Sequence, residues 1–472
     1  LGTGKIINGR KIILGEDSMS ADKFEYRELR QRGIEEFKKI DHNIRLGEMI
    51  NKTLPSIINF NTKSREEIEK YQLNKLSKLV DYAFENIPLY KKKYSEVGFK
   101  SGDIRSFADF ERLPILYKDE LIDGFPSQIV KNLDDYKYST RSSGSSGRFV
   151  TVAVDLNAIY IDTLQGIRQF LFQSDYRFTP DDVVLFIYTC PWWITDINGK
   201  YKLDFLPTTT NPSKALDYIK GIRPTIISTY PTYLQSLCEQ RIKLSDYGVK
   251  CVIVHSEQSN KNFREEMGKI LDVSVIDEYS SEELTRIALE CKNSNYHLEE
   301  DSCYVEVLNP QNKIIRNGTG VVVGTNLLNM ATPIIRYYQG DVVTIDSNKE
   351  CSCGHHGRIL TEVHGREMDC IRSNGKLIPA SAFMDLAYNW YLTYKIPVHA
   401  LKYQIVQTSE NEIEVLIAKG AFELSQEDLK NIKESFYSLV ERSMHISIKF
   451  TNDFIQNSNK FKPVINIMGE VK

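Results

Sequence analysis

From about residue 136 onwards, short runs rich in β-branched and aromatic residues alternate with stretches of helical periodicity. The predicted strands are 149–154, 183–188, 225–228, 251–254, 273–276, 303–308 and 320–325, and the predicted helices are 156–172, 232–240 and 261–271. Such alternation is typical of an α/β domain, because each helix buries its apolar stripe against a sheet. The sequence therefore predicts a large α/β domain with central sheets flanked by helices.

A different pattern precedes this region. An apolar stripe at helical spacing predicts a helix within 65–98. The stripe consists of Leu73, Leu76, Leu79, Val80, Ala83 and Phe84. We interpret residues 1–19, which lack an apolar core, as a leader or a disordered segment outside the fold.

The pattern changes again near residue 365. The predicted elements that follow are strands at 400–407 and 412–417, a helix at 426–442 and a strand at 446–450. A β-β-α-β unit of about a hundred residues is large enough to fold alone. We therefore predict a large domain at 20–368 and a C-terminal domain at 369–472.

Composition narrows the classes of partner. The chain has 472 residues, 41% of them hydrophobic, and a formal net charge of −3. Without a basic excess, a nucleic-acid partner is not expected. The longest apolar run, 183–194, is too short to span a bilayer, so no membrane association is expected. With no signal peptide, we expect a cytoplasmic protein whose 8 cysteines are thiols or metal ligands.

One segment has the chemistry of a phosphate-binding loop. Residues 139–148 read Ser-Thr-Arg-Ser-Ser-Gly-Ser-Ser-Gly-Arg. Glycines let backbone N–H groups converge on an anion, hydroxyls donate hydrogen bonds, and Arg148 supplies charge. The spacing is not that of a P-loop, and β-type sequence follows it instead of a helix. On these residues alone, a flexible Ser/Gly linker is an equally open interpretation.

The loop resembles the Ser/Thr-Gly-rich signature of the adenylate-forming superfamily, and four further segments follow in that family's order. They are Ile-Asp-Glu-Tyr-Ser-Ser-Glu-Glu at 276–283, Pro-Ile-Ile-Arg-Tyr-Tyr-Gln-Gly-Asp at 333–341, Gly-Arg-Glu-Met-Asp at 365–369 and Asn-Lys-Phe-Lys-Pro-Val at 459–464. Segments 76–90 and 113–118, with Glu290-Cys291, are similar to the phenylacetate-CoA ligase-like and capsule-biosynthesis-like branch. The resemblance runs from about residue 70 to the C-terminus.

This resemblance implies a large N-terminal adenylate-forming domain and a small, mobile α+β C-terminal domain. It implies an AMP-forming ligase that uses ATP and Mg²⁺ to activate a carboxylic acid and then transfers the acyl group to a thiol such as coenzyme A. One alternative is a stand-alone adenylation enzyme that loads an amino or aryl acid onto a carrier protein. Another is a nucleotide-binding scaffold without catalysis. Aryl, fatty and amino acids all remain open as substrates, and so does a homodimer.

The resemblance also assigns nucleotide-binding roles. The β- and γ-phosphates of ATP would be held by Ser142, Ser143, Gly144, Ser145, Ser146, Gly147 and Arg148. Tyr279 would stack on adenine, and Asp341 would accept hydrogen bonds from the ribose hydroxyls. The Mg²⁺-binding acid is Glu283 by its spacing from Tyr279, or Glu282 if Ser281 is the hydroxyl residue required directly before it.

Catalytic roles follow in the same way. Arg366 would lie against ribose or phosphate, and Asp369 matches the hinge about which the small domain turns. Lys460 matches the lysine that bridges the substrate carboxylate and the α-phosphate, where an ammonium would stabilise charge developing in the transition state. Lys462 is the alternative, because Asn459 stands where the family usually has glycine.

The acid pocket is implied at two segments. The expected pocket residues are Tyr188, Trp192, Trp193, Ser256 and Glu257. The two tryptophans favour an aromatic or apolar acid, although such residues are also ordinary core residues. Glu257 would recognise an amino group or would only cap a turn.

A structural zinc site is the last prediction. Cys351 and Cys353 are one residue apart, and Cys291 and His297 lie upstream. Three thiolates and one imidazole form a common closed zinc site, which has no open position for catalysis. His355 or His356 could replace His297. Reduced cysteines in a turn are the alternative interpretation.

Overall fold

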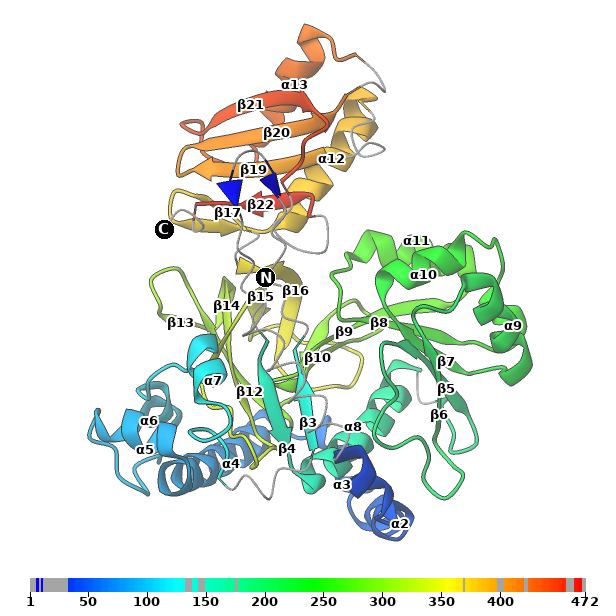
Figure 1. The fold of residues 1–472 in the computed structure, drawn as a ribbon, viewed down its shortest axis with the longest axis vertical. Coiled ribbons are helices and arrows are strands. Elements are labelled where there is room, and N and C mark those ends of the chain that lie inside the picture. Colours follow the sequence, from blue (N-terminus) through cyan, green and yellow to red (C-terminus); the bar gives the residue numbers. More distant parts are fainter. Residues whose placement is uncertain are drawn as a thin grey trace.

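The computed structural model describes residues 6–7, 10–11, 33–131, 138–142, 149–174, 177–367, 370–396, 403–419, 423–455 and 462–468. Within them, one 12-stranded sheet with helices on both faces forms the large unit, and a smaller four-stranded unit ends the chain (Figure 1). The predicted α/β class is confirmed. The strand order of the large sheet is β13-β12-β14-β15-β16-β11-β10-β9-β8-β7-β5-β6.

One half of this sheet is parallel. Its strands are β5 (Val183–Tyr188), β6 (Lys202–Pro207), β7 (Ile226–Thr229), β8 (Cys251–His255) and β9 (Ser274–Ser281). Helices α9 (Pro212–Ile222), α10 (Pro231–Cys238) and α11 (Lys261–Leu271) cover one face, and α8 (Leu156–Gln173) covers the other. Side chains alternate between the two faces along each strand, so Leu185 packs toward α9 and α10 whereas Phe186 packs toward α8.

The other half is antiparallel. Its strands are β10 (Thr285–Glu290), β11 (Tyr296–Leu298), β12 (Cys303–Leu308), β13 (Ile314–Ile315), β14 (Asn317–Asn326), β15 (Tyr337–Asp346) and β16 (Ile359–Arg366). This half curls, because Tyr279 of β9 and Val343 of β15 share one apolar core although three strands separate β9 from β15. The curl brings residues of distant strands to one place.

Helices near the N-terminus cover two different surfaces. Helices α4 (Arg65–Asn86), α5 (Pro88–Ser95), α6 (Phe107–Glu111) and α7 (Lys118–Gly124) share the apolar core of the antiparallel half, whereas α2 (His42–Lys52) and α3 (Leu54–Phe60) pack against α8. A short 3₁₀ helix lies at Leu244–Tyr247. A capping box between Ser64 and Glu67 begins α4. The helix predicted within 65–98 is therefore two helices, because Pro88 cannot continue α4 but fits the first turn of α5.

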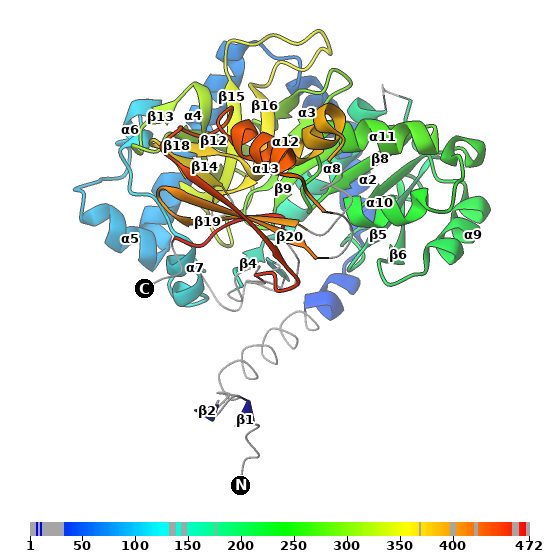
Figure 2. The same ribbon diagram turned by 90° about the horizontal axis from the view of Figure 1, so that it is seen from above.

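The C-terminal unit has its own apolar core, drawn from residues 371–464. It contains a hairpin of β17 (Ile371–Ser373) and β18 (Lys376–Ile378), helices α12 (Ala380–Tyr394) and α13 (Gln426–Phe436), and strands β19 (Tyr403–Ser409), β20 (Glu412–Ala418), β21 (His445–Thr451) and β22 (Val464–Asn466). The sheet order is β21-β20-β19-β22. Figure 2 shows this unit lying across the middle of the large one.

Two predictions for this unit need correction. Helix α12 was not predicted, and α13 ends at Phe436 rather than at 442. The segment after α13 is hydrogen-bonded to the β17–β18 hairpin instead of continuing the helix. Glu441 N donates to Ser373 Oγ at 3.1 Å, and Asn374 Nδ2 donates to Glu441 Oε1 at 3.2 Å. The domain boundary at 364–369 remains a prediction.

Two further pairs of short strands lie outside the two larger sheets. Strands β1 (Ile6–Ile7) and β2 (Arg10–Lys11) pair antiparallel, and β3 (Tyr138–Arg141) and β4 (Thr151–Val154) form a separate hairpin. Among the helices that the structure describes, none combines the length and the apolar character needed to cross a membrane.

Candidate nucleotide, acid and metal sites

Three predicted nucleotide-site residues meet although they lie on three different strands. The hydroxyl of Tyr279 on β9 donates to Asp341 Oδ2 on β15 at 2.8 Å. Arg366 on β16 places its Nε 2.9 Å from Asp341 Oδ1, and the two residues are partners in the strand register. The charge of Asp341 raises the pKa of Arg366, and burial raises the pKa of Tyr279 well above its ordinary value. The group therefore presents a neutral phenol, a carboxylate and a guanidinium together.

The two candidate Mg²⁺-binding acids point to different neighbours. Tyr337 Oη donates to Glu283 Oε1 at 3.4 Å, and burial raises the pKa of Glu283. Glu282 instead accepts a hydrogen bond from Thr140 Oγ1 on β3. Glu283 thus lies with the nucleotide-site residues, and Glu282 ties the β9–β10 turn to the β3–β4 hairpin. Ser281 accepts a hydrogen bond from the backbone N–H of Leu284 at 3.1 Å, inside the same turn.

The predicted phosphate loop connects β3 to β4. Ser142 closes it, because its N–H donates to the Val150 carbonyl at 2.9 Å and its Oγ accepts from Val150 N at 3.0 Å. Ser143, Gly144, Ser145, Ser146, Gly147 and Arg148 lie outside the described residues. Thr140, on the strand that leads into this segment, contacts Glu282, so the end of β3 lies beside the acidic pair.

The predicted hinge and catalytic lysine also lie outside the described residues, at Asp369 and Lys460. Lys462, the alternative, stands just before β22, which pairs parallel with β19. The buried side chain of Gln404 holds both flanks of the lysine segment. Its Nε2 donates to the carbonyls of Ile455 and Lys462, each at 2.9 Å, and its Oε1 accepts from Ile455 N at 2.9 Å.

Sequence reasoning missed one contact beside the hinge motif. Gly365 has φ +95°, and a Cβ at this position would come within 2.9 Å of Gln258 Oε1. Gln258 Nε2 donates to the His364 carbonyl at 2.8 Å. The glycine of the hinge motif is thus required both by its backbone conformation and by the closeness of Gln258.

The expected acid-pocket residues separate into two groups. Tyr188 and Ser256 lie near His255, and Trp192 stacks on Phe186 with ring centroids 5.7 Å apart. Trp193 instead packs against other aromatic rings in a separate apolar cluster. Glu257 caps helix α10 by accepting from Thr232 N at 3.2 Å and from Thr232 Oγ1 at 2.8 Å. Trp193 therefore belongs to a different apolar cluster from the Phe186 that Trp192 contacts, and the carboxylate of Glu257 is engaged at the start of α10.

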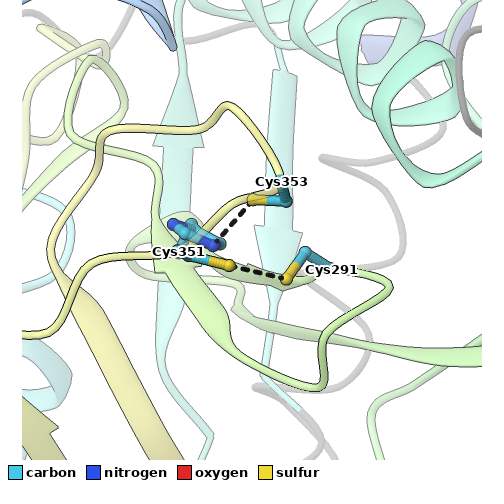
Figure 3. A group of neighbouring side chains, drawn as sticks. Cys291, Cys351 and Cys353 are labelled. Atoms are coloured by element: carbon cyan, nitrogen blue, oxygen red, sulfur yellow. Dashed lines mark hydrogen bonds between the residues drawn. The ribbon is translucent and has the colours of Figure 1, made fainter.

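The four predicted metal ligands do come together. Donor atoms of Cys291, His297, Cys351 and Cys353 all lie within 4.8 Å of one another. The Sγ atoms of Cys291 and Cys351 are 3.7 Å apart, and Cys353 Sγ is 3.2 Å from His297 Nε2 (Figure 3). Bonds of about 2.3 Å to sulfur in a tetrahedral zinc site separate two sulfurs by about 3.8 Å. The spacing therefore fits zinc.

The surroundings of the cluster fit a metal as well. His297 Nδ1 is 3.3 Å from the Gly357 carbonyl, which would fix the ring with Nε2 facing the sulfurs. Hydrogen bonds from Cys353 and His297 hold the pKa of Cys291 below its ordinary value, and the same contact raises the pKa of Cys353, so the thiolate of the pair lies on Cys291. Neither alternative histidine belongs to this cluster: His355 Nε2 lies 3.1 Å from Glu299 Oε1, and His356 Nδ1 lies 3.1 Å from the Lys63 carbonyl.

Comparison with known proteins gives two kinds of similarity. No protein-family profile matches the chain. The phenylacetate-coenzyme A ligase of Thermus thermophilus is 24% identical over 331 residues, which is 66% of this chain and 74% of that protein. The phenylacetate-coenzyme A ligase of Escherichia coli K12 is 23% identical over 302 residues, which is 60% of this chain and 68% of that protein.

Among solved structures, an open conformation of 2-hydroxyisobutyryl-CoA ligase superposes with a TM-score of 0.67 at 20% identity. The match covers 86% of this chain and 93% of that one. The same ligase in its postadenylation state gives a TM-score of 0.66 at 18% identity. These matches establish a shared fold that includes most of both chains.

Proposed function

Because the chain is a ligase of the adenylate-forming superfamily, in its phenylacetate-CoA ligase-like branch, we propose that it activates a carboxylic acid with ATP and transfers the acyl group to coenzyme A. The observation that carries the proposal is the meeting of Tyr279, Asp341 and Arg366, because the sequence resemblance assigned these residues to one nucleotide independently of the structure. The similarity to two phenylacetate-coenzyme A ligases supports the same chemistry.

The first half-reaction forms the acyl-adenylate. A carboxylate oxygen of the acid attacks the α-phosphorus of ATP, and the bond to the β-phosphate breaks to release pyrophosphate. Asp341 would hold the ribose hydroxyls, and Glu283 would bind Mg²⁺ beside the phosphate loop. Lys460 would approach the α-phosphate from the small unit. These groups act by positioning and by neutralising charge rather than by covalent participation.

In the second half-reaction the thiol of coenzyme A attacks the acyl carbon, and AMP leaves. A turn of the small unit about Asp369 would exchange Lys460 for the thiol at the same adenylate. The contact of Gln258 with the backbone at His364 and Gly365 fixes the large-unit side of this connection, which supports a hinge placed directly after it.

A structural zinc ion belongs to the proposal. Cys291, His297, Cys351 and Cys353 would hold it, and it would fasten the β10–β11 turn to the β15–β16 connection. All four ligands come from the protein, so the ion would supply no open position for substrate.

The decisive assay is pyrophosphate release from Mg-ATP against aryl, fatty and amino acids, with and without coenzyme A. Release that depends on one acid and is followed by thioester formation supports the proposal. Release without any coenzyme A thioester, together with acylation of a carrier protein, would replace the acceptor. No release with any acid from folded protein would overturn the proposed function.

A further inference from the structure

Four polar and aromatic side chains gather where four neighbouring parallel strands end. This strand-end cluster consists of Tyr188 at the end of β5, Tyr230 after β7, His255 at the end of β8 and Glu278 on β9. The rings of Tyr188, Tyr230 and His255 have centroids 5.2–5.7 Å apart, and His255 and Glu278 are register partners. Ligands of open α/β sheets bind at the carboxyl ends of the strands.

An apolar cavity lies beside the strand-end cluster, because Arg286, which lines the cavity, places its Nη1 3.6 Å from Glu278 Oε2. Phe186, Ile253 and Ile276 pack with Phe170 of α8 on one face of the sheet. Tyr188, His255 and Glu278 each follow two residues later on the same strands, so they face the same side. The cavity on this side is lined by Phe170, Phe178, Phe186, Trp192, Gly166 and Arg286. The cluster and the apolar cavity therefore lie on the same side of the sheet and meet at Arg286.

One polar atom of the cluster lacks a partner. His255 is 8% exposed, and its Nδ1 is 2.8 Å from Ser256 Oγ. Its Nε2 is buried, and no hydrogen-bond partner is found for it among the residues that the structure describes. A buried donor or acceptor without a partner loses its hydration without compensation, which is rare in stable folds. Burial also lowers the pKa of His255, so the ring is neutral.

The other groups around His255 already satisfy one another. Arg286 Nε lies 3.1 Å from Asp162 Oδ1, and its Nη1 lies 3.6 Å from Glu278 Oε2. Burial raises the pKa of Glu278, but the charge of Arg286 together with hydrogen bonds from Gln169 and Ser280 holds that pKa below its ordinary value. The Tyr188 hydroxyl is engaged by Ser256 and Tyr230. These residues therefore leave His255 Nε2 as the atom that a ligand would complete.

We propose that the acid is a hydroxy acid, whose hydroxyl group pairs with Nε2 of His255 between the rings of Tyr188 and Tyr230. This inference rests on the proposed function and names its substrate class. A hydroxyl both donates and accepts, so it matches a neutral imidazole in either tautomer. A second carboxylate on the tail would meet Glu278 and Asp162, which outnumber the single guanidinium of Arg286.

The test compares acids that differ by one hydroxyl. Pyrophosphate release would be measured for phenylacetate and 4-hydroxyphenylacetate, benzoate and 3-hydroxybenzoate, and butyrate and 3-hydroxybutyrate. We expect the hydroxylated member of the accepted pair to have a kcat/KM at least about 100-fold higher, because a site that hydrogen-bonds a hydroxyl rejects the analogue without it. Equal values within a pair overturn the inference but keep the proposed function. No release with any acid overturns both.

Two variants test His255 itself. In His255→Leu the preference for the hydroxylated acid should fall to less than about 5-fold, mainly because kcat/KM for that acid decreases. His255→Asn, which keeps a short polar group, should retain part of the preference and serves if the leucine variant does not fold. His445→Leu, at an exposed histidine of the small unit, is the matched control and should leave the preference unchanged. An unchanged preference in both His255 variants overturns the inference.

Discussion

The nucleotide-site residues and the metal cluster occupy opposite ends of the same strands. Asp341 and Arg366 pair at one end of β15 and β16, and Cys351 and Cys353 lie in the connection at the other end. Likewise, β9 and β10 meet at the Glu282–Glu283 turn, and Cys291 follows the far end of β10. At the metal end, four residues supply all the proposed ligands. At the nucleotide end, the proposed site also needs groups from the phosphate loop and from the small unit.

The difference shows how rigidity and motion are divided. The metal cluster joins short connections through four donors within 4.8 Å, so it would fix the registers of β10, β11, β15 and β16. The proposed nucleotide end would stay open for substrates and for the lysine of the small unit. A far end fixed by metal would keep Asp341, Arg366 and Tyr279 aligned during the proposed movement of the small unit.

The largest expected effect comes from the open end. Lys460→Ala should lower pyrophosphate release by at least about 10³-fold, roughly 4 kcal/mol of transition-state stabilisation, because an ammonium at the α-phosphate is lost. The unfolding temperature should not change. Lys462→Ala is the matched control, and a larger loss there would move the catalytic role to Lys462.

Changes to the metal cluster should alter the stability of the fold rather than the rate of pyrophosphate release. Cys351→Ser, or removal of metal by a chelator, should lower the free energy of unfolding by on the order of 4 kcal/mol. Pyrophosphate release at 25 °C should keep more than half of its rate. Metal analysis should give one zinc per chain, and Ser352→Ala should change neither quantity. A metal content well below one per chain would remove the zinc site and with it the contrast between the two ends.

A smaller effect is expected at Asp341. Asp341→Asn should raise the KM for ATP by roughly 10-fold to 100-fold, because hydrogen bonds to a charged group contribute about 1.5–3 kcal/mol. The KM for the acid should change by less than about 3-fold. Equal changes in both KM values would mean that the variant disturbs the whole site through Arg366 rather than the ribose contact alone.

The smallest effect is expected where the large unit meets the hinge. Gly365→Ala should lower the free energy of unfolding by about 1–2 kcal/mol, since an L-residue is strained at positive φ. Adding Gln258→Ala should restore only that part of the lost unfolding free energy that comes from the close contact with the Gln258 side chain. Full recovery in the double variant would show that backbone strain contributes nothing at this position.

Much of the fold could be predicted where one physical signal dominates. The bounds of β5, β12 and α11 agree with the prediction because each has a clean apolar pattern. Strands β15 and β16 were missed because glycines and charged residues interrupt their patterns. Helix α12 was missed although Phe383, Ala387 and Trp390, all fully buried, follow helical spacing.

The candidate site divides in the same way. Motifs located Asp341 and Arg366 even though the strands that carry them were not predicted, and cysteine spacing located the metal cluster. The resemblance implied the segment 255–257 as part of the acid pocket, but nothing in the sequence singled out His255 within it, because a single histidine at a strand end has no spacing pattern. Its significance comes from burial and from an unpaired nitrogen, which only tertiary structure reveals.

The hydrogen bonds of Gln404 to Ile455 and Lys462 set the length of the segment that carries the proposed catalytic lysine. Only residues 456–461 lie between the two anchored flanks. At about 3.8 Å between successive Cα atoms, Lys460 stays within about 8 Å of Lys462 whatever path the segment takes. So short a segment cannot carry the lysine far from the small unit. If Lys460 is the catalytic lysine, its ammonium would reach the nucleotide only when the whole small unit moves, and adenylation would then require docking of that unit.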